Sequence, residues 1–197
     1  MKTNIFILFF SFAISITSCS KAQNSTRNAG IFTVLQGDTI LQIDGVINKH
    51  SLTNFNKLHM QYPDLRTISI VNCDGSKDDE VNLQLSFKIH ELQLNTHLQE
   101  NGLIASGGVD LFLAGINRSC GENTLIGVHS WSSLFKQATD FPIGHENHQP
   151  YIDYYISIGF TKQESEEFYY FTINSASARD IYWMTEEEIQ EYNIITE

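Results

Sequence analysis

The sequence predicts an α/β fold with a mostly parallel sheet. Short β-branched runs such as residues 67–71 alternate with segments of helical periodicity such as 52–62, and this alternation is typical of βαβ units. Glycine-rich turns fall between a predicted strand and the helix that follows it. A length of 197 residues suits one domain with a single core.

The first half of the chain predicts a hairpin, a helix, a buried strand and a second helix. Alternating apolar residues over 31–46 surround the turn Gln36-Gly37-Asp38, which indicates a hairpin or two short strands. Apolar residues three or four apart predict a helix over 52–62, and the run 67–71 is typical of a buried parallel strand. After a turn at 72–76, acidic residues in the first turn favour a helix over 78–93.

The second half repeats the alternation. Residues 96–99 and 103–106 are predicted strands, and a glycine-rich turn leads from the second of them into an apolar helix over 109–114. A further strand is predicted over 125–128. Two helices at 149–158 and 163–173 follow, and Thr185 caps an acidic helix over 186–192.

Composition excludes several classes of function. The chain has 12 Lys and Arg against 23 Asp and Glu, a formal net charge of −11 and a pI near 5.0. Nucleic acid and anionic membranes bind clustered basic residues, so neither is an expected partner. A hydrophobic fraction of 42% excludes a disordered chain. Gly-rich phosphate loops are absent, and no cofactor is expected.

Residues 1–18 read as a lipoprotein-type signal peptide. The apolar run 5–16 has 12 residues, which suits a signal-peptide core of about 7–15 rather than a membrane span of roughly 20. Ile16-Thr17-Ser18-Cys19 resembles a bacterial lipobox, so Cys19 is the expected lipidation site and 19–30 a flexible tether. The alternative is an ordinary signal peptide cut after Ala22. The domain, 31–197, is then a periplasmic or outer-membrane lipoprotein, or a soluble secreted protein.

Two other residue sets leave alternatives open. In an oxidising compartment Cys73 and Cys120 either form a disulfide or remain buried thiols. His145 and His148 have a spacing that can bind zinc on a helix, but neighbouring prolines and a glycine predict a loop. No third ligand is evident in the sequence, so no metal is expected.

Three positions pair a reactive side chain with suitable surroundings. Ser106 precedes Gly107 at a strand-to-helix turn, where backbone amides can hold an oxyanion; the alternative is a plain N-cap serine. His129 ends the predicted strand 125–128 and can serve as a base in the same crevice, or as a structural histidine. Asp180 can orient the imidazole, although one acid in an acidic chain indicates little by itself.

As an ordered set, these segments resemble the ClpP/crotonase superfamily, specifically ClpP-like secreted or periplasmic proteins of bacteria. IASGGVDLFLAGINR (104–118) is similar to the ClpP serine segment, and GVHSW (127–131) to the strand end that carries the catalytic histidine. ARDIYWMTEEEIQEYNI (178–194) resembles the stretch with the catalytic aspartate. The resemblance covers roughly residues 40–196 and implies a ClpP/crotonase-like spiral of βαβ units.

The resemblance also implies roles. Ser106 would be the nucleophile, His129 the general base and Asp180 the group that fixes its tautomer. The amide of Gly107 would donate to the oxyanion, together with an amide of the turn at Gly75. Where ClpP carries Ser-Pro-Gly-Gly, this chain has a single glycine in its 72–76 turn, and Asp180 sits one residue further from its cap than the family spacing.

The expected function is therefore an exported serine hydrolase, a ClpP-like peptidase that uses a Ser-His-Asp triad. The altered glycine turn favours the alternative, a non-catalytic binding or assembly protein on the same fold. A crotonase-type acyl-thioester enzyme is disfavoured, because an exported protein rarely meets coenzyme A. Expected partners are a peptide or small acyl substrate, the membrane through the lipid anchor alone and, by resemblance, further copies in a trimer or hexamer.

Overall fold

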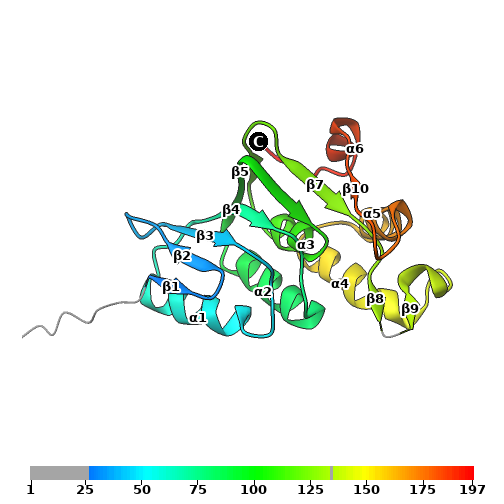
Figure 1. Cartoon of the computed structure of the whole chain (residues 1–197), viewed down its shortest axis with the longest axis horizontal. Coiled ribbons are helices and arrows are strands. Elements are labelled where there is room, and N and C mark those ends of the chain that lie inside the picture. Colours follow the sequence, from blue (N-terminus) through cyan, green and yellow to red (C-terminus); the bar gives the residue numbers. More distant parts are fainter. Residues whose placement is uncertain (1–26, 134) are drawn as a thin grey trace, which may run out of the picture.

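The computed structural model describes residues 27–133 and 135–197, which form an α/β fold around one eight-stranded sheet (Figure 1). The strands are β1 (Asn28–Ala29), β2 (Phe32–Val34), β3 (Ile40–Asp44), β4 (Thr67–Cys73), β5 (Asn95–Ala105), β6 (Arg118–Cys120), β7 (Leu125–Val128), β8 (Ser132–Ser133), β9 (Lys136–Gln137) and β10 (Tyr182–Trp183). The sheet order is β1-β2-β3-β4-β5-β7-β10, with β6 paired to β5 beside this path. Strands β8 and β9 pair with each other, outside the main sheet.

The helices are α1 (Ser51–Gln61), α2 (Asp79–Glu91), α3 (Gly107–Leu113), α4 (Gln149–Ser157), α5 (Lys162–Ser175) and α6 (Glu186–Glu191), with short 3-10 turns at Ala138–Asp140 and Glu146–His148. Helices α1, α2 and α3 lie side by side along the sheet, and α4 continues this layer next to α2 (Figure 1). Helix α5 packs on α4. The layer therefore runs from the N-terminal hairpin to the segment that follows β7.

The centre of the sheet is parallel and its edges are antiparallel. Strands β3, β4, β5 and β7 run in one direction, as does β6 beside β5. Strands β1, β2 and β10 pair antiparallel at the two edges. The prediction of a mostly parallel α/β fold is confirmed. Because the strands are parallel, β4, β5 and β7 end at the same edge of the sheet, where open α/β sheets usually bind ligands.

The core forms where the predicted apolar faces meet. In α1, Phe55 and Leu58 are fully buried, as their helical spacing predicts. They face a sheet whose buried residues include Leu41 of β3 and Ile68 and Ile70 of β4. Each such side chain contributes about 1.5–3 kcal/mol when it is withdrawn from water, and this burial holds the helix layer on the sheet.

Some elements differ from the sequence prediction. The two strands expected at 96–99 and 103–106 form one strand, β5, because Asn101 takes a positive φ of 57° and lets the chain bend without leaving the sheet. The pairing of β4 with β5 shifts its register between Ile70 and Asn72 at this bend. Strands β1, β6, β8, β9 and β10 were not predicted.

Only the last four residues of the expected tether, 27–30, belong to the described part of the chain. Within 27–30, Asn28–Ala29 form β1 and pair with β2. The signal peptide, Cys19 and the rest of the tether lie outside the described residues. Across 27–133 and 135–197, no helix has the length and apolar character needed to cross a membrane.

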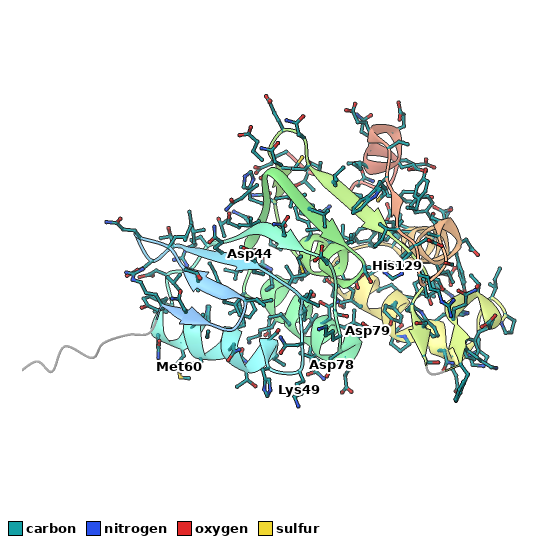
Figure 2. The ribbon with its side chains drawn as sticks, viewed as in Figure 1. Asp44, Lys49, Met60, Asp78, Asp79 and His129 are labelled. Carbon is teal, nitrogen blue, oxygen red and sulfur yellow. The ribbon has the colours of Figure 1, made fainter. Side chains whose placement is uncertain are left out.

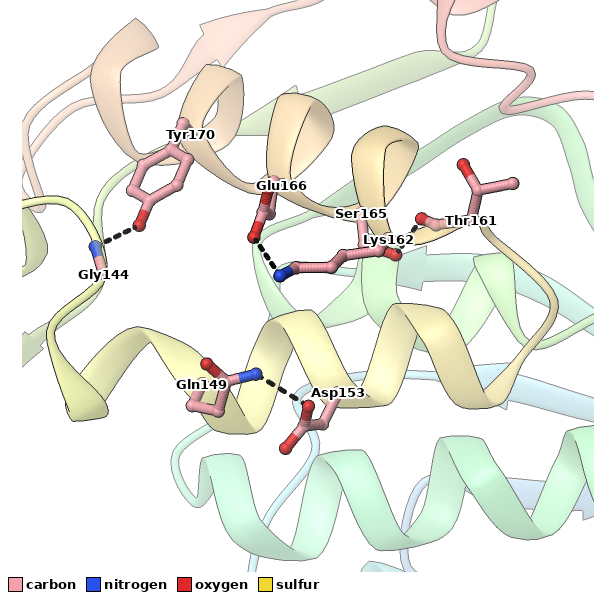
Figure 3. Close-up of polar contacts among 8 residues, drawn as sticks. All are labelled: Gly144, Gln149, Asp153, Thr161, Lys162, Ser165, Glu166 and Tyr170. Atoms are coloured by element: carbon pink, nitrogen blue, oxygen red, sulfur yellow. Dashed lines mark hydrogen bonds and ion pairs between the residues drawn. The ribbon is translucent and has the colours of Figure 1, made fainter.

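Helices α4 and α5 bring aromatic side chains toward the end of β7. Helix α5 starts at a capping box in which Thr161 accepts from the Glu164 amide, and Ser165 bonds back to the Thr161 carbonyl at 2.8 Å (Figure 3). On its buried face lie Phe168 and Tyr169. The helix predicted over 163–173 is confirmed, and these aromatics line the cavity described next.

Candidate active site

Ser106 occupies the turn between β5 and α3 in a strained backbone conformation. Its φ is 52° and its ψ −128°, and a non-glycine residue at positive φ costs free energy. The turn is fixed because the Ser106 amide donates to the Gly127 carbonyl at 2.9 Å and the Val109 amide donates to the Ser106 carbonyl at 2.8 Å. Ser106 is the N-cap residue of α3 by position, but its hydroxyl makes no capping hydrogen bond.

The turn after β4 lies against the serine turn. A β-carbon on Gly75, whose φ is 128°, would lie 3.0 Å from Ser106 Cβ and 3.3 Å from the Ala105 carbonyl oxygen. The Gly75 carbonyl accepts from the Ile47 amide at 2.9 Å. Similarly, a β-carbon on Gly107 would lie 2.9 Å from Ser76 Oγ. The backbones of Gly75 and Gly107 therefore both lie against the serine turn, and their role as oxyanion donors stays a prediction.

His129 follows β7 and lines the same cavity as Ser106. Its Nδ1 lies 2.8 Å from the carbonyl oxygen of Ser130. Because a carbonyl only accepts, Nδ1 carries the proton in the neutral ring, and Nε2 is left with a free lone pair. The backbone itself thus selects the tautomer in which Nε2 can act as a base.

Asp180 is hydrogen-bonded to Ser177 rather than to this pair. It is exposed, and its carboxylate accepts from the Ser177 hydroxyl at 2.8 Å while its amide donates to the Ser177 carbonyl. Strand β10 pairs Tyr182 with Val128, so Asp180 is near the end of β7 in the sheet. Among the described residues it makes no hydrogen bond to His129. The structure brings together Ser106, Gly107, Gly75 and His129, and it does not bring Asp180 to the imidazole.

A small cavity joins the serine to residues that the sequence analysis did not select. Its free volume is about 30 Å³, room for about one water-sized group. Figure 2 marks two of the contributors, Asp79 at the start of α2 and His129 after β7. The lining residues are Asp79, Ser106, Gly107, Val109, Asp110, Val128, His129, Trp131, Tyr151, Tyr155, Phe168, Tyr169, Thr172 and Ile173.

Asp110 is the most perturbed acid of this cavity. Burial raises the pKa of its carboxyl from 3.8 to about 7, although hydrogen bonds from Tyr155 at 2.7 Å and from Asn82 Nδ2 at 3.2 Å oppose the shift. The nearby charge of Asp79 raises this pKa further. The signal in the sequence was a single acid inside the otherwise apolar helix GGVDLFL.

The other reactive groups are structural. His145 Nδ1 accepts from the Asn147 amide and caps a 3-10 turn. The buried His148 ring binds the Tyr169 hydroxyl at 2.7 Å and the Pro142 carbonyl at 3.2 Å. No cluster of three or more metal-ligating side chains occurs within 27–133 and 135–197.

The two cysteines of the domain are free thiols. Cys73 is buried and Cys120 is partly buried, which resolves the alternative left open by the sequence against the disulfide. Burial raises the pKa of the Cys73 thiol to about 11, so it stays protonated and weakly nucleophilic at neutral pH. Neither cysteine is among the residues that line the cavity beside Ser106.

Comparison with known proteins supports the fold. No protein-family model matches the chain, and no curated protein sequence matches it. The chain is similar to solved structures of the ClpP protease catalytic domain from Plasmodium falciparum (TM-score 0.53, 19% identity, 80% of this chain and 82% of that one) and of a ClpP1 mutant from Listeria monocytogenes (0.51, 17%, 80% and 89%). It is also similar to a mutant of a membrane-bound stomatin-specific protease in complex with a substrate peptide (0.51, 19%, 80% and 72%). The protein therefore has a ClpP/crotonase-like fold.

Proposed function

We propose that the protein is an exported serine hydrolase, and that its substrates are peptides or small acyl compounds. The observation that carries the proposal is that Ser106 and His129 line one cavity, with the serine hydroxyl uncapped and Nε2 of the histidine unprotonated. A nucleophile and its general base must share one site and come within hydrogen-bond reach during the reaction; among the described residues no hydrogen bond joins Ser106 Oγ to His129 before a substrate binds.

The proposed reaction uses the backbone on both sides of the serine. Ser106 Oγ attacks the substrate carbonyl, and its proton passes to Nε2 of His129. The amides of Gly107 and Gly75 donate to the oxyanion, and collapse of this intermediate expels the leaving group with the proton from Nε2. Water, deprotonated by His129, then releases the acyl group from the serine.

Two observations favour the competing function, a binding or assembly protein without catalysis. The cavity has room for about one water-sized group, and the Asp180 carboxylate accepts from the Ser177 hydroxyl rather than from His129. In this alternative the strained serine turn is an inherited feature of the fold. Under both functions we propose export and lipidation at Cys19. We also propose self-association, which the exposed apolar side chains of Phe135 and Ile143 support.

A fluorophosphonate probe tests for an activated serine. We expect the mature wild-type protein to be labelled, and Ser106→Ala and His129→Ala to lose the label. Ser133→Ala, an exposed serine outside the cavity, is the matched control and should label like wild type. Circular dichroism establishes that each variant is folded. Wild-type labelling no higher than that of folded Ser106→Ala would sink the hydrolase and favour the binding protein.

A further inference from the structure

The cavity beside Ser106 is too small for a substrate in this structure. Its free volume of about 30 Å³ holds one water-sized group, which is less than an acyl group or a side chain needs. Buried lining residues such as Tyr155 and Phe168 form its floor, whereas Trp131 and Tyr151 are partly exposed and lie toward solvent. A substrate group therefore enters this cavity only if the partly exposed wall moves.

Three aromatic rings form that wall. The ring of Tyr151 stacks on that of Trp131, 6.2 Å away, and on that of Tyr169, 5.6 Å away. The other two rings are tied to each other, because Trp131 Nε1 donates to the Tyr169 hydroxyl at 2.8 Å. Tyr169 is buried, and its hydroxyl also lies 2.7 Å from Nδ1 of the buried His148. Trp131 and Tyr169 are thus fixed to the interior by polar contacts that Tyr151 does not share.

Tyr151 has a different anchor. Its hydroxyl donates to Asp79 Oδ2 at 2.7 Å, and this is its one hydrogen bond among the described residues. It lies in the first turn of α4, whereas Tyr154 and Tyr155, in the following turn, donate to Asp110. The body of α4 is therefore held to α3, and the contact with Asp79 joins its first turn to α2.

Asp79 also connects the wall to the turn that follows β4. Its Oδ1 accepts from the hydroxyl of Ser76, the residue after Gly75, which is a proposed oxyanion donor. Hydrogen bonds to a carboxylate are stronger than those between neutral groups, and Asp79 accepts one from each side. Release of Tyr151 breaks one of these bonds, while the bond from Ser76 keeps Asp79 in place.

We propose that the hydrogen bond from Tyr151 to Asp79 is a latch that holds the cavity beside Ser106 closed. Substrate enters when this bond breaks and the Tyr151 side chain turns away from the cavity. Because only the open fraction of the protein takes up substrate, the latch weakens the apparent affinity in proportion to that fraction. The catalytic consequence rests on the proposed function. Opening of the cavity does not depend on catalysis.

Access to position 106 measures opening without catalysis. In Ser106→Cys, the rate at which N-phenylmaleimide alkylates the new thiol follows the open fraction, and the partly exposed Cys120, outside the cavity, is the reference in the same sample. We expect Tyr151→Phe, which keeps the ring and removes the hydroxyl, to raise this rate at least about threefold relative to Cys120. Tyr182→Phe removes a comparable bond, from Tyr182 to the Glu188 carboxylate at 2.9 Å, and should leave the rate unchanged. Peptide mass spectrometry gives the rates, and circular dichroism establishes that each variant is folded.

A double-mutant cycle assigns the effect to the pair. In an Asp79→Ala background, Tyr151→Phe should change the alkylation rate no further, because the latch is already broken. Glu80→Ala removes the neighbouring acid of the first turn of α2, which bonds to Gln84 instead, and Tyr151→Phe should keep its full effect in that background. A rate that Tyr151→Phe does not raise overturns the latch, and so does an equal rise with and without Asp79.

Fluorophosphonate labelling of the protein with Ser106 intact separates the latch from the proposed function. We expect Tyr151→Phe to label at least about threefold faster than wild type, and Tyr182→Phe to label like wild type. Faster thiol alkylation without fluorophosphonate labelling of any variant sinks the hydrolase and keeps the latch. Wild-type labelling with both rates unchanged by Tyr151→Phe sinks the latch and keeps the hydrolase. Faster alkylation beside unchanged labelling overturns the claim that substrate enters past Tyr151.

Discussion

Ser106 shows how a single residue can be held in a costly conformation. A non-glycine residue in a sparsely populated backbone region costs about 1–3 kcal/mol, and it persists only where its surroundings fix it. Here hydrogen bonds to Gly127 and from Val109 hold the residue, and Gly75 lies so close that a β-carbon on it would be 3.0 Å from Ser106 Cβ. The hydroxyl is thereby kept out of the capping position and directed to the cavity.

Asp180 is the residue whose sequence-based role the geometry does not support. Because the Ser130 carbonyl already holds Nδ1 of His129, we expect Asp180→Asn to lower kcat/KM for a p-nitrophenyl ester by less than about threefold, against a loss of about a thousandfold or more for His129→Ala. Steady-state kinetics on the folded variants, with Asp153→Asn as control, measure both. A loss near the ten-thousandfold seen when a triad carboxylate is replaced would restore Asp180 to the triad.

At the scale of single residues, the sequence predicts candidate site residues whose neighbours in the chain form the turn that holds them. Ser106, Gly107 and His129 follow strands, and their neighbours in the chain reveal the setting. Asp79 and Asp110 could not be found in this way. Both acids line one cavity only because α2, α3 and α4 pack together, and no local pattern in the sequence predicts that packing.

Among the elements, α3 lies close against strand β4. A β-carbon on Gly108 would clash with the backbone carbonyl of Cys73 in β4, which only a shift of the helix or the strand could relieve. The glycine pair after Ser106 therefore seats the helix on the sheet as well as leaving room for a substrate carbonyl. Long periodic helices such as α1, α2 and α5 were predictable, whereas short polar strands such as β6 form only because a neighbouring strand pairs with them.

We expect Gly108→Ala to lower the free energy of unfolding by about 1–3 kcal/mol, because the overpacked helix must move away from β4. Urea denaturation followed by circular dichroism gives the value. Gly144→Ala is the comparison: its φ is 81° with open space around it, so it tests backbone strain without a clash and should cost about 1 kcal/mol. If Gly108→Ala cost no more than Gly144→Ala, the close seating of α3 on β4 would be wrong.

For the molecule as a whole, the proposal is a compact acidic domain outside the cytoplasm. Residues 1–18 contain one charged side chain, Lys2, so their removal changes the formal net charge from −11 to −12. The α/β class and the parallel sheet were predictable because strand and helix periods alternate along the chain. The single-sequence pattern could not predict that the sheet would continue through β10 at its far edge, because that pairing joins residues more than fifty positions apart.

Intact mass spectrometry of the protein from a bacterial membrane fraction tests its processing. We expect a chain that begins at Cys19 with attached acyl groups, and Cys19→Ala should shift the protein to the soluble fraction. A mature chain that begins at Gln23, without lipid, would instead identify an ordinary signal peptide cut after Ala22.

The hydrogen bond from Ser106 to Gly127 ties the proposed nucleophile to the strand that carries the proposed base. Much of the cavity wall comes from other parts of the chain, since Tyr151, Tyr155 and Tyr169 come from α4 and α5. In the proposed hydrolase, the reacting pair and this wall are thus encoded in separable stretches of sequence. Descendants of this domain could acquire new substrates by changing the α4–α5 hairpin while the reacting pair stays as it is, and the same division offers a place to graft selectivity by engineering.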